Sequence, residues 1–289
     1  MTKTSKDIAA ALGQYAHDNG RDHITVWNEF LQHSVDTLSF TNEELREGKW
    51  FERIKRYDAI NPTYSEIFRG LVEAVAVNGH CDIFGGAYEE FFQSKFKASN
   101  TGQFFTPESV CDLMADVVGN FEGCAVSDCA CGSGRTLIAH AKQAYQNEDI
   151  RLKAFVYHGG DTDNTSVMMC ALNFAINGMV GMVERRNALT MEFFGGYIVN
   201  DIKVPFYNDL IRIKRYDDEK ELIQHFNWLK SQKDLREYYL MRAYGQNKPT
   251  ESAPRQASRG LVENSPKTGE SRPNRARRQR YECTHAATA

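Results

Sequence analysis

The residues best suited to chemistry in this sequence begin with an acid and a turn that contains two glycines. Residues 128–134 read Asp-Cys-Ala-Cys-Gly-Ser-Gly, between a predicted strand and a predicted helix. Gly132 and Gly134 permit unusual backbone angles and a close approach of the main chain to a ligand. The first N–H groups of the helix that follows have no partner within that helix. The stretch predicts a ligand-binding turn, and a simple tight turn between strand and helix is the alternative.

A second acidic turn follows the next predicted strand. Residues 159–163 read Gly-Gly-Asp-Thr-Asp. An acid at the end of the second strand of such a fold can accept hydrogen bonds from ribose hydroxyl groups. Asp161 is the candidate for this contact, with Asp163 beside it, although an ordinary surface turn would also explain Asp163. Together the turns predict a nucleoside-containing ligand, while their spacing departs from the G-x-G-x-x-G motif of dinucleotide enzymes.

The elements that must hold these turns follow from the spacing of apolar residues. Four short apolar stretches read as strands, at residues 124–130, 154–157, 182–185 and 197–200. Helical patterns separate the first three strands, one ending at residue 142 and one covering residues 166–177. Strands that alternate with helices predict an α/β fold with a parallel, doubly wound sheet. A further edge strand is predicted near residues 210–214, before a charged helical stretch over 217–244.

Helices are predicted ahead of the first strand. Helical spacing occurs over residues 5–17, 24–38 and 61–78. Thr106 is the predicted N-cap of another helix, with Pro107 in its first position. The apolar stripe of this helix, which we expect to be buried, is Val110, Leu113, Met114, Val117 and Val118. The patterns divide the chain into a helical N-terminal domain (1–97), a ligand-binding core (98–215), a helical extension (216–246) and a disordered basic tail (247–289).

Two of these motifs resemble those of the N6-adenine DNA methylases. Residues 103–107, Gln-Phe-Phe-Thr-Pro, resemble the family's G-Q-[FY]-[FY]-T-P element, and residues 128–134 resemble its D-P-A-C-G-S-G. Residues 82–89 and 171–178 resemble helical elements of the most similar subgroup, the modification (methylase) subunit of type I restriction-modification systems. The resemblance implies a helical N-terminal domain followed by a Rossmann-like, S-adenosylmethionine-dependent methyltransferase sheet, which the short C-terminal pattern suggests is truncated.

The resemblance also implies roles for single residues. The methionine side of S-adenosylmethionine would be lined by Gln103, Phe105, Thr106 and Pro107. The amino-acid and sulfonium region would be held by Asp128, Cys131, Gly132, Ser133 and Gly134. Asp161 would accept hydrogen bonds from the ribose hydroxyls, with Asp163 nearby. In this sequence Cys129 stands where the family usually has Pro.

The family ends its fourth strand with N-P-P-[FY], which binds the adenine amino group and stacks on the flipped base. Here Asn200 stands in the expected place, but Asp201 and Ile202 replace the two prolines. Because Pro205 and Phe206 follow shortly after, we expect Asn200, Pro205 and Phe206 to form the catalytic part of an adenine-N6 DNA methyltransferase. One alternative is a degenerate, inactive module that binds cofactor or partner proteins. Another is an unrelated α/β nucleotide-binding enzyme.

Composition and charge limit the partners. The chain has 289 residues and a net charge of −3, but residues 247–289 contain nine basic and four acidic residues, so the remainder is acidic. Because an acidic body attracts phosphates poorly, we expect double-stranded DNA to bind with help from restriction-modification partner subunits. None of the seven cysteines has C-x-x-C spacing, so no metal site is expected. No apolar run has the length of a membrane span and no signal peptide is evident, which predicts a cytoplasmic protein without a membrane partner.

Overall fold

The computed structural model of this chain describes residues 4–40, 42–57, 61–96, 105–119, 125–146, 154–201, 212–234 and 236–237. All the described residues belong to one compact unit. The expected site residues Gln103, Pro205 and Phe206 and the expected basic tail 247–289 lie outside the described residues. Within the described ranges, none of the helices combines the length and apolar character needed to cross a membrane.

The N-terminal part of the chain is helical, as its periodicity predicted. Its elements are α1 (Ser5–Asp18), α2 (His23–Leu38), α3 (Asn42–Arg46), α4 (Lys49–Ile54), η1 (Lys55–Tyr57), α5 (Asn61–Asn78) and α6 (Ile83–Phe96). Side chains cap the first two helices. Thr4 and Asp7 form a capping box at the start of α1, and the Asp22 carboxylate accepts hydrogen bonds from the first main-chain N–H groups of α2.

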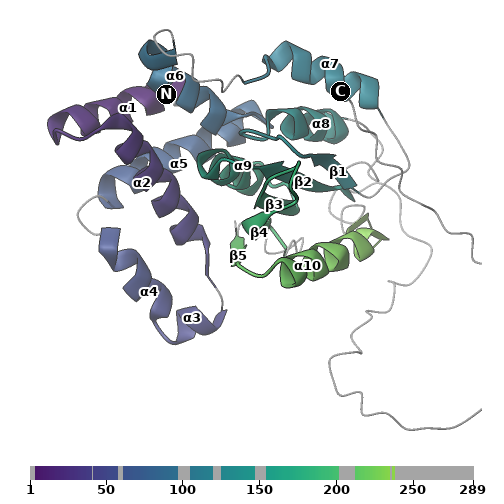
Figure 1. The fold of residues 1–289 in the computed structure, drawn as a ribbon. Helices are drawn as coiled ribbons and strands as arrows, with labels where there is room; N and C mark the ends of the chain where they lie inside the picture. The colour runs from purple at the N-terminus through teal and green to yellow at the C-terminus, as the bar shows by residue number, and fades with distance from the viewer. Residues whose placement is uncertain are drawn as a thin grey trace, which may run out of the picture. The chain divides into compact units, whose positions relative to one another are not determined.

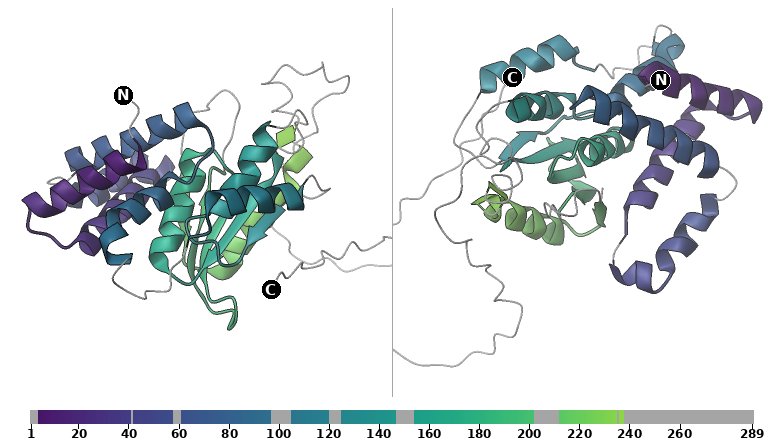
Figure 2. Two further views of the ribbon diagram at one scale, coloured as in Figure 1. Left: turned by 90° about the horizontal axis from the view of Figure 1, so that it is seen from above. Right: turned by 180° about the vertical axis from the view of Figure 1, so that it is seen from behind.

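These helices share a hydrophobic core with the rest of the compact unit. Trp27, Phe30 and Phe84 are fully buried in the same cluster as Phe174, which comes from a helix on the sheet. Figure 2 shows the N-terminal helices gathered beside that helix, α9 (Asn164–Ile176), which α2 and α6 contact directly. The described residues before and after residue 97 belong to the same compact unit, and the domain boundaries expected from the sequence stay predictions.

Within the described residues, the sheet has five strands in the order of the sequence. They are β1 (Ala125–Asp128), β2 (Val156–Asp161), β3 (Gly181–Arg186), β4 (Phe193–Val199) and β5 (Ile213–Tyr216). The first three strands are parallel, so the strands predicted around both acidic turns are confirmed. The prediction of a parallel sheet is wrong for β4, which runs antiparallel to β3, and for β5, which runs antiparallel to β4.

A short turn explains the reversed direction of β4. The Asn187 side-chain oxygen accepts hydrogen bonds from the main-chain N–H groups of Leu189 and Thr190, at 2.9 and 3.1 Å. Met191 takes a positive φ of 61° in the same turn, and its N–H bonds back to the Asn187 carbonyl at 2.7 Å. A parallel connection needs a crossover of roughly a dozen residues or more, so this short link can only form a hairpin.

Helices cover both faces of the sheet. On one face lie α8 (Arg135–Gln146) and α9, and on the other lies α10 (Glu219–Ser231), as Figure 1 shows. Leu222 and Phe226 of α10 pack on Val156, Met182 and Ile198 of the sheet. Helices on both faces thus bury β2 and β3 in the middle layer. The two acidic turns lie at the carboxyl ends of the parallel strands.

The helix before β1 differs from the prediction in two ways. In α7 (Glu108–Val118) the N-cap is Pro107 rather than Thr106, and no side chain caps it. The apolar stripe that we expected to be buried is exposed. It comprises Val110, Leu113, Met114, Val117 and Val118. Instead the small residues Cys111 and Ala115 face Ala139 of α8, because small side chains let two helices approach closely. Periodicity detects an apolar stripe but not the face that a neighbour covers.

Candidate functional site

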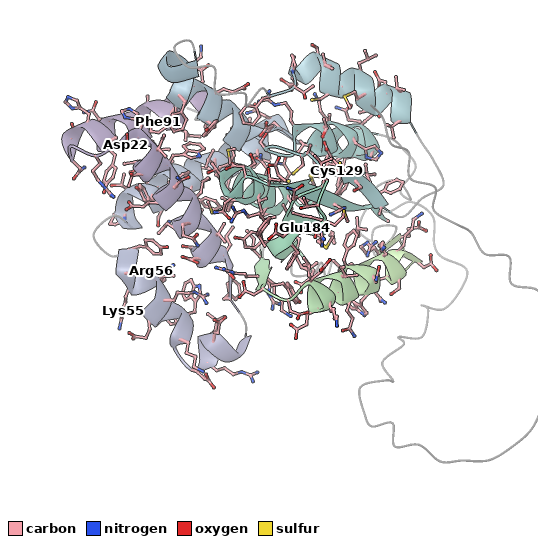
Figure 3. All side chains as sticks on the ribbon, in the orientation of Figure 1. Asp22, Lys55, Arg56, Phe91, Cys129 and Glu184 are labelled. Carbon is pink, nitrogen blue, oxygen red and sulfur yellow. The ribbon has the colours of Figure 1, made fainter. Side chains whose placement is uncertain are left out.

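The glycine turn begins where β1 ends. The Asp128 carboxylate accepts hydrogen bonds from the main-chain N–H of Ala130, at 3.0 Å, and from the Thr136 hydroxyl. The turn closes through a 2.7 Å hydrogen bond from the Gly134 N–H to the Cys131 carbonyl. Asp128 therefore fixes the start of the turn and the first turn of α8 together. In Figure 3, Cys129 lies at this end of β1.

The second acidic turn is joined directly to the first. The Asp161 carboxylate accepts hydrogen bonds from the main-chain N–H groups of Gly132, at 3.0 Å, and Asp163, at 2.9 Å. In addition, the Cys131 N–H donates to the Gly160 carbonyl at 2.9 Å. Asp161 is only half-buried, and a carboxylate offers roughly four acceptor positions, so these two bonds leave it capacity for a ligand.

The two glycines of the first turn have different reasons to be glycine. Both have positive φ angles, 54° at Gly132 and 87° at Gly134. A side-chain carbon at Gly134 would lie 2.8 Å from the buried Cys170 sulfur, so Gly134 is required by packing. At Gly132 the nearest atoms are those of the Phe105 ring, at 3.7 Å. Gly132 is therefore the position where the main chain is open to a ligand.

The Thr-Pro stretch before α7 lies against the same turn. The Phe105 ring is next to Gly132 and stacks under the Arg135 guanidinium, whose central carbon is 5.4 Å from the ring centroid. The Thr106 carbonyl accepts a 3.1 Å hydrogen bond from Arg135, and Pro107 then begins α7. The structure thus brings the described part of this stretch to the glycine turn.

Three of the expected ligand residues, Cys131, Ser133 and Asp163, use their side chains in contacts within the protein. Ser133 is 1% exposed and Cys131 is 6% exposed. Burial and a hydrogen bond with Cys131 raise the pKa of the neighbouring Cys170 thiol well above its usual value. The Asp163 carboxylate caps α9, accepting a 2.8 Å hydrogen bond from the Ser166 N–H. Ser133 and Cys131 can offer a ligand only their main chain.

Asn200, the expected acceptor of the adenine amino group, does not join this site. It follows β4, and Val199 pairs with Gly181, the first residue of β3. Asp128 and Asp161 lie at the other end of the parallel strands, and the six residues of β3 span roughly 20 Å. The reversed direction of β4 therefore carries Asn200 to the edge of the sheet opposite the two acidic turns.

The Asn200 side chain has a structural role at that edge. It is buried, with a φ of 53°, and its amide donates hydrogen bonds to the carbonyls of Phe174, Ala175 and Met179, at 3.2, 3.2 and 2.9 Å. Its side-chain oxygen accepts a hydrogen bond from the Arg212 N–H. These contacts join the end of β4 to the end of α9 and to Met179 beyond it, where the Phe174 and Ala175 carbonyls also accept main-chain hydrogen bonds.

Sequence reasoning gave no role to three polar residues that contact the turn, namely Asp82, Arg135 and Asn173. Burial alone would lower the pKa of Arg135, but the ion pairs with Asp82 and Glu89 outweigh it and raise that pKa. Asp82 and Asn173 lie in stretches covered by the resemblance, and Arg135 directly follows the last glycine. In the sequence these residues stand out only by being polar. Polarity alone does not show which groups a side chain contacts.

A cavity of about 410 Å³ lies on the helical side of these residues. Its walls include Cys81, Asp82, Glu89, Cys111, Arg135 and Lys142. Asp128 and Asp161 do not line it, so the cavity is separate from the two acidic turns.

Part of the chain matches known proteins. Residues 79–198 match the family described as N-6 DNA Methylase. The type I restriction enzyme EcoEI methylase subunit of Escherichia coli is 27% identical over 114 residues, a match that covers 38% of this chain. The chain spans 23% of the length of that relative. No solved structure matches the chain.

Proposed function

We propose that the chain, whose residues 79–198 match the N-6 DNA methylase family, binds S-adenosylmethionine as part of an enzyme that methylates adenine N6 in DNA. The observation that carries the proposal is the meeting of Asp128, Gly132 and Asp161 at the ends of two adjacent parallel strands. In open α/β sheets, ligands bind at the carboxyl ends of the strands.

The groups at this edge suit such a cofactor. Asp161 would accept hydrogen bonds from the two ribose hydroxyls, and Asp128 would attract the ammonium group of the methionine part. The main chain at Gly132 leaves room for close contact, and the Phe105 ring offers an aromatic face to a positively charged sulfur. When bound, S-adenosylmethionine supplies a methyl group activated by that positive charge.

The acceptor side of the reaction has less support. Methyl transfer needs groups that hold the adenine amino nitrogen in line with the methyl group. The Asn200 amide is already bonded to three carbonyls at the opposite edge of the sheet. This observation favours a second candidate function, a methyltransferase-like module that binds the cofactor or partner proteins without transferring the methyl group.

Partners are proposed on chemical grounds. The relative named above is a methylase subunit of a restriction enzyme, and we propose double-stranded DNA and restriction-modification subunits as partners of this chain. With a net charge of −3, the chain has little overall attraction for DNA phosphates, so a partner subunit would supply it.

The deciding experiment combines two measurements in one buffer. Calorimetric titration with S-adenosylmethionine measures binding, and a tritiated-methyl assay on adenine-containing DNA measures transfer. We expect binding by the wild-type protein and weaker binding by Asp161→Ala. Binding with transfer supports the enzyme, whereas binding without transfer supports the second candidate or a subunit that needs its partner. A wild-type protein that binds no cofactor would contradict the proposal that this edge is a cofactor site.

A further inference from the structure

A single buried carboxylate is the centre of the contacts behind the glycine turn. Asp82 directly precedes α6, and its side chain is 5% exposed. One carboxylate oxygen accepts hydrogen bonds from the Ser133 hydroxyl, at 2.6 Å, and from Arg135 Nε, at 2.7 Å. The other accepts from the Asn173 amide, at 2.7 Å, and from the Gly85 N–H, at 2.8 Å. We call Asp82, Ser133, Arg135 and Asn173 the Asp82 cluster.

The Asp82 cluster joins the turn to three other parts of the fold. The fully buried Asn173 of α9 donates a second hydrogen bond to the Ser133 carbonyl, at 2.9 Å. Arg135 donates to the Thr106 carbonyl before α7 and to the Glu89 carboxylate of α6, at 3.1 and 2.8 Å. The turn is therefore held by its main chain as well as by its side chains. None of these bonds involves Asp128 or Asp161.

The glycine at position 85 is independent evidence that the Asp82 carboxylate must lie close to the turn. A side-chain carbon at Gly85 would lie 2.2 Å from one Asp82 carboxylate oxygen and 2.5 Å from the Ser133 hydroxyl oxygen. Any larger residue would push apart the two partners of the shortest hydrogen bond in the cluster. Glycine at position 85 is what lets the Asp82 carboxylate reach the turn.

We propose that Asp82 is a positioning residue for the cofactor turn. Glycines at left-handed angles lose much conformational freedom when they are fixed, so an unsupported turn would sample many shapes before binding a ligand. Holding it in one shape beforehand lowers the entropy cost of binding and raises affinity. The Asp82 cluster supplies that support from the N-terminal helical part, which thereby helps to set the affinity of the site. The identity of the ligand rests on the proposed function, whereas the support of the turn by the Asp82 cluster does not.

The test measures the rigidity of the turn and the binding of the cofactor separately. In Asp82→Asn the side chain keeps its size but loses the charge that pairs with Arg135. Hydrogen exchange without ligand follows the N–H groups of Gly132 and Gly134, which bond to Asp161 and Cys131. We expect their exchange to speed up and the affinity for S-adenosylmethionine to fall about tenfold, a typical coupling between contacting groups. Ser133→Ala removes one hydrogen bond only and serves if Asp82→Asn does not fold.

The matched control is Glu29→Gln, which removes a carboxylate from another ion pair of the helical part, with Arg21 at 2.5 Å. It should leave exchange in the turn and cofactor affinity unchanged. Unchanged turn exchange in both Asp82→Asn and Ser133→Ala overturns the proposal. Faster exchange with unchanged affinity overturns the link to binding. If the wild-type protein binds no S-adenosylmethionine, the proposed function fails, while exchange still decides whether Asp82 supports the turn.

Discussion

At the scale of single residues, Asp161 and Asp163 lie two positions apart in one turn, yet their carboxylates have different partners. Asp161 bonds to the main chain of the glycine turn, and Asp163 caps α9. Asp161→Ala should therefore weaken S-adenosylmethionine binding by roughly tenfold to a hundredfold, because a hydrogen bond to a charged group is lost. Calorimetric titration of each variant measures this effect.

Asp163→Ala is the matched variant for that comparison. Loss of an N-cap costs about 1 kcal/mol of unfolding free energy, and we expect cofactor affinity to stay close to that of the wild type. Urea denaturation measures the stability change. Equal losses of affinity in the two variants would mean that the turn acts as a whole and that Asp161 has no special contact.

Asn200→Ala tests whether this residue is structural. Three buried carbonyls would lose a donor, and alanine is disfavoured at a positive φ, so the free energy of unfolding should fall by roughly 3 kcal/mol. Denaturant unfolding checks the value. A variant of unchanged stability that had lost methyl transfer would instead return Asn200 to the catalytic role that its position in the sequence suggested.

At the scale of elements, a buried carboxylate joins β2 and β3 by a hydrogen bond. The Glu184 carboxylate, on β3 (Figure 3), accepts hydrogen bonds from His158 of β2, at 3.0 Å, and from Arg186, at 2.9 and 3.0 Å. Burial by itself would raise the pKa of Glu184, but the bonds from His158 and Arg186 outweigh it and lower that pKa. The folded chain thus favours the charged carboxylate.

The pH dependence of stability follows from that direction. Because the folded-state pKa of Glu184 is below the unfolded value of about 4.3, its contribution is complete well above that value and is lost as the pH falls through the folded-state pKa. Urea denaturation at pH 7 and near pH 3.5 should show a smaller loss of stability in Glu184→Gln than in the wild type. An identical loss in both proteins would mean that other carboxylates cause the acid sensitivity.

Strand positions were predictable from the sequence, but the direction of β4 was not. Buried strands read as apolar runs, and the turns after β1 and β2 carry their own glycine and acid signals. The direction of β4 depends on the hairpin at Asn187, whose side-chain contacts no apolar pattern reports. The face of α7 that is buried depends on Ala139 of α8, far along the chain, which no local pattern reports.

At the scale of the whole molecule, the shared core determines which parts of the chain can fold on their own. The sequence predicted a boundary at residue 97 because helices give way to alternating strands and helices there. Apolar patterns say which residues are buried but not against which partner, and here Trp27, Phe84 and Phe174 belong to one cluster. The Asp82 cluster was hidden for the same reason, since its members are far apart in the chain.

Removal of the N-terminal helices should therefore unfold the rest. A variant that begins at residue 98 loses the partners of Phe174 and leaves Asn173 and Arg135 without the Asp82 carboxylate. An unpaired buried charge and an exposed core should prevent cooperative folding. Circular dichroism during heating checks this, with the full chain as control. A sharp transition in the shortened variant would restore the boundary that the pattern predicted.

The exposed sulfur of Cys129 makes the glycine turn accessible to optical measurement. Among the cysteines that the structure describes, Cys129 alone is exposed, and it directly follows Asp128. With Cys81, Cys124 and Cys283 replaced by serine, a maleimide dye would attach beside the turn and leave the buried thiols of Cys111, Cys131 and Cys170 unmodified. A dye whose emission depends on polarity would then report, in a cuvette and in seconds, each molecule that enters or leaves this edge of the sheet.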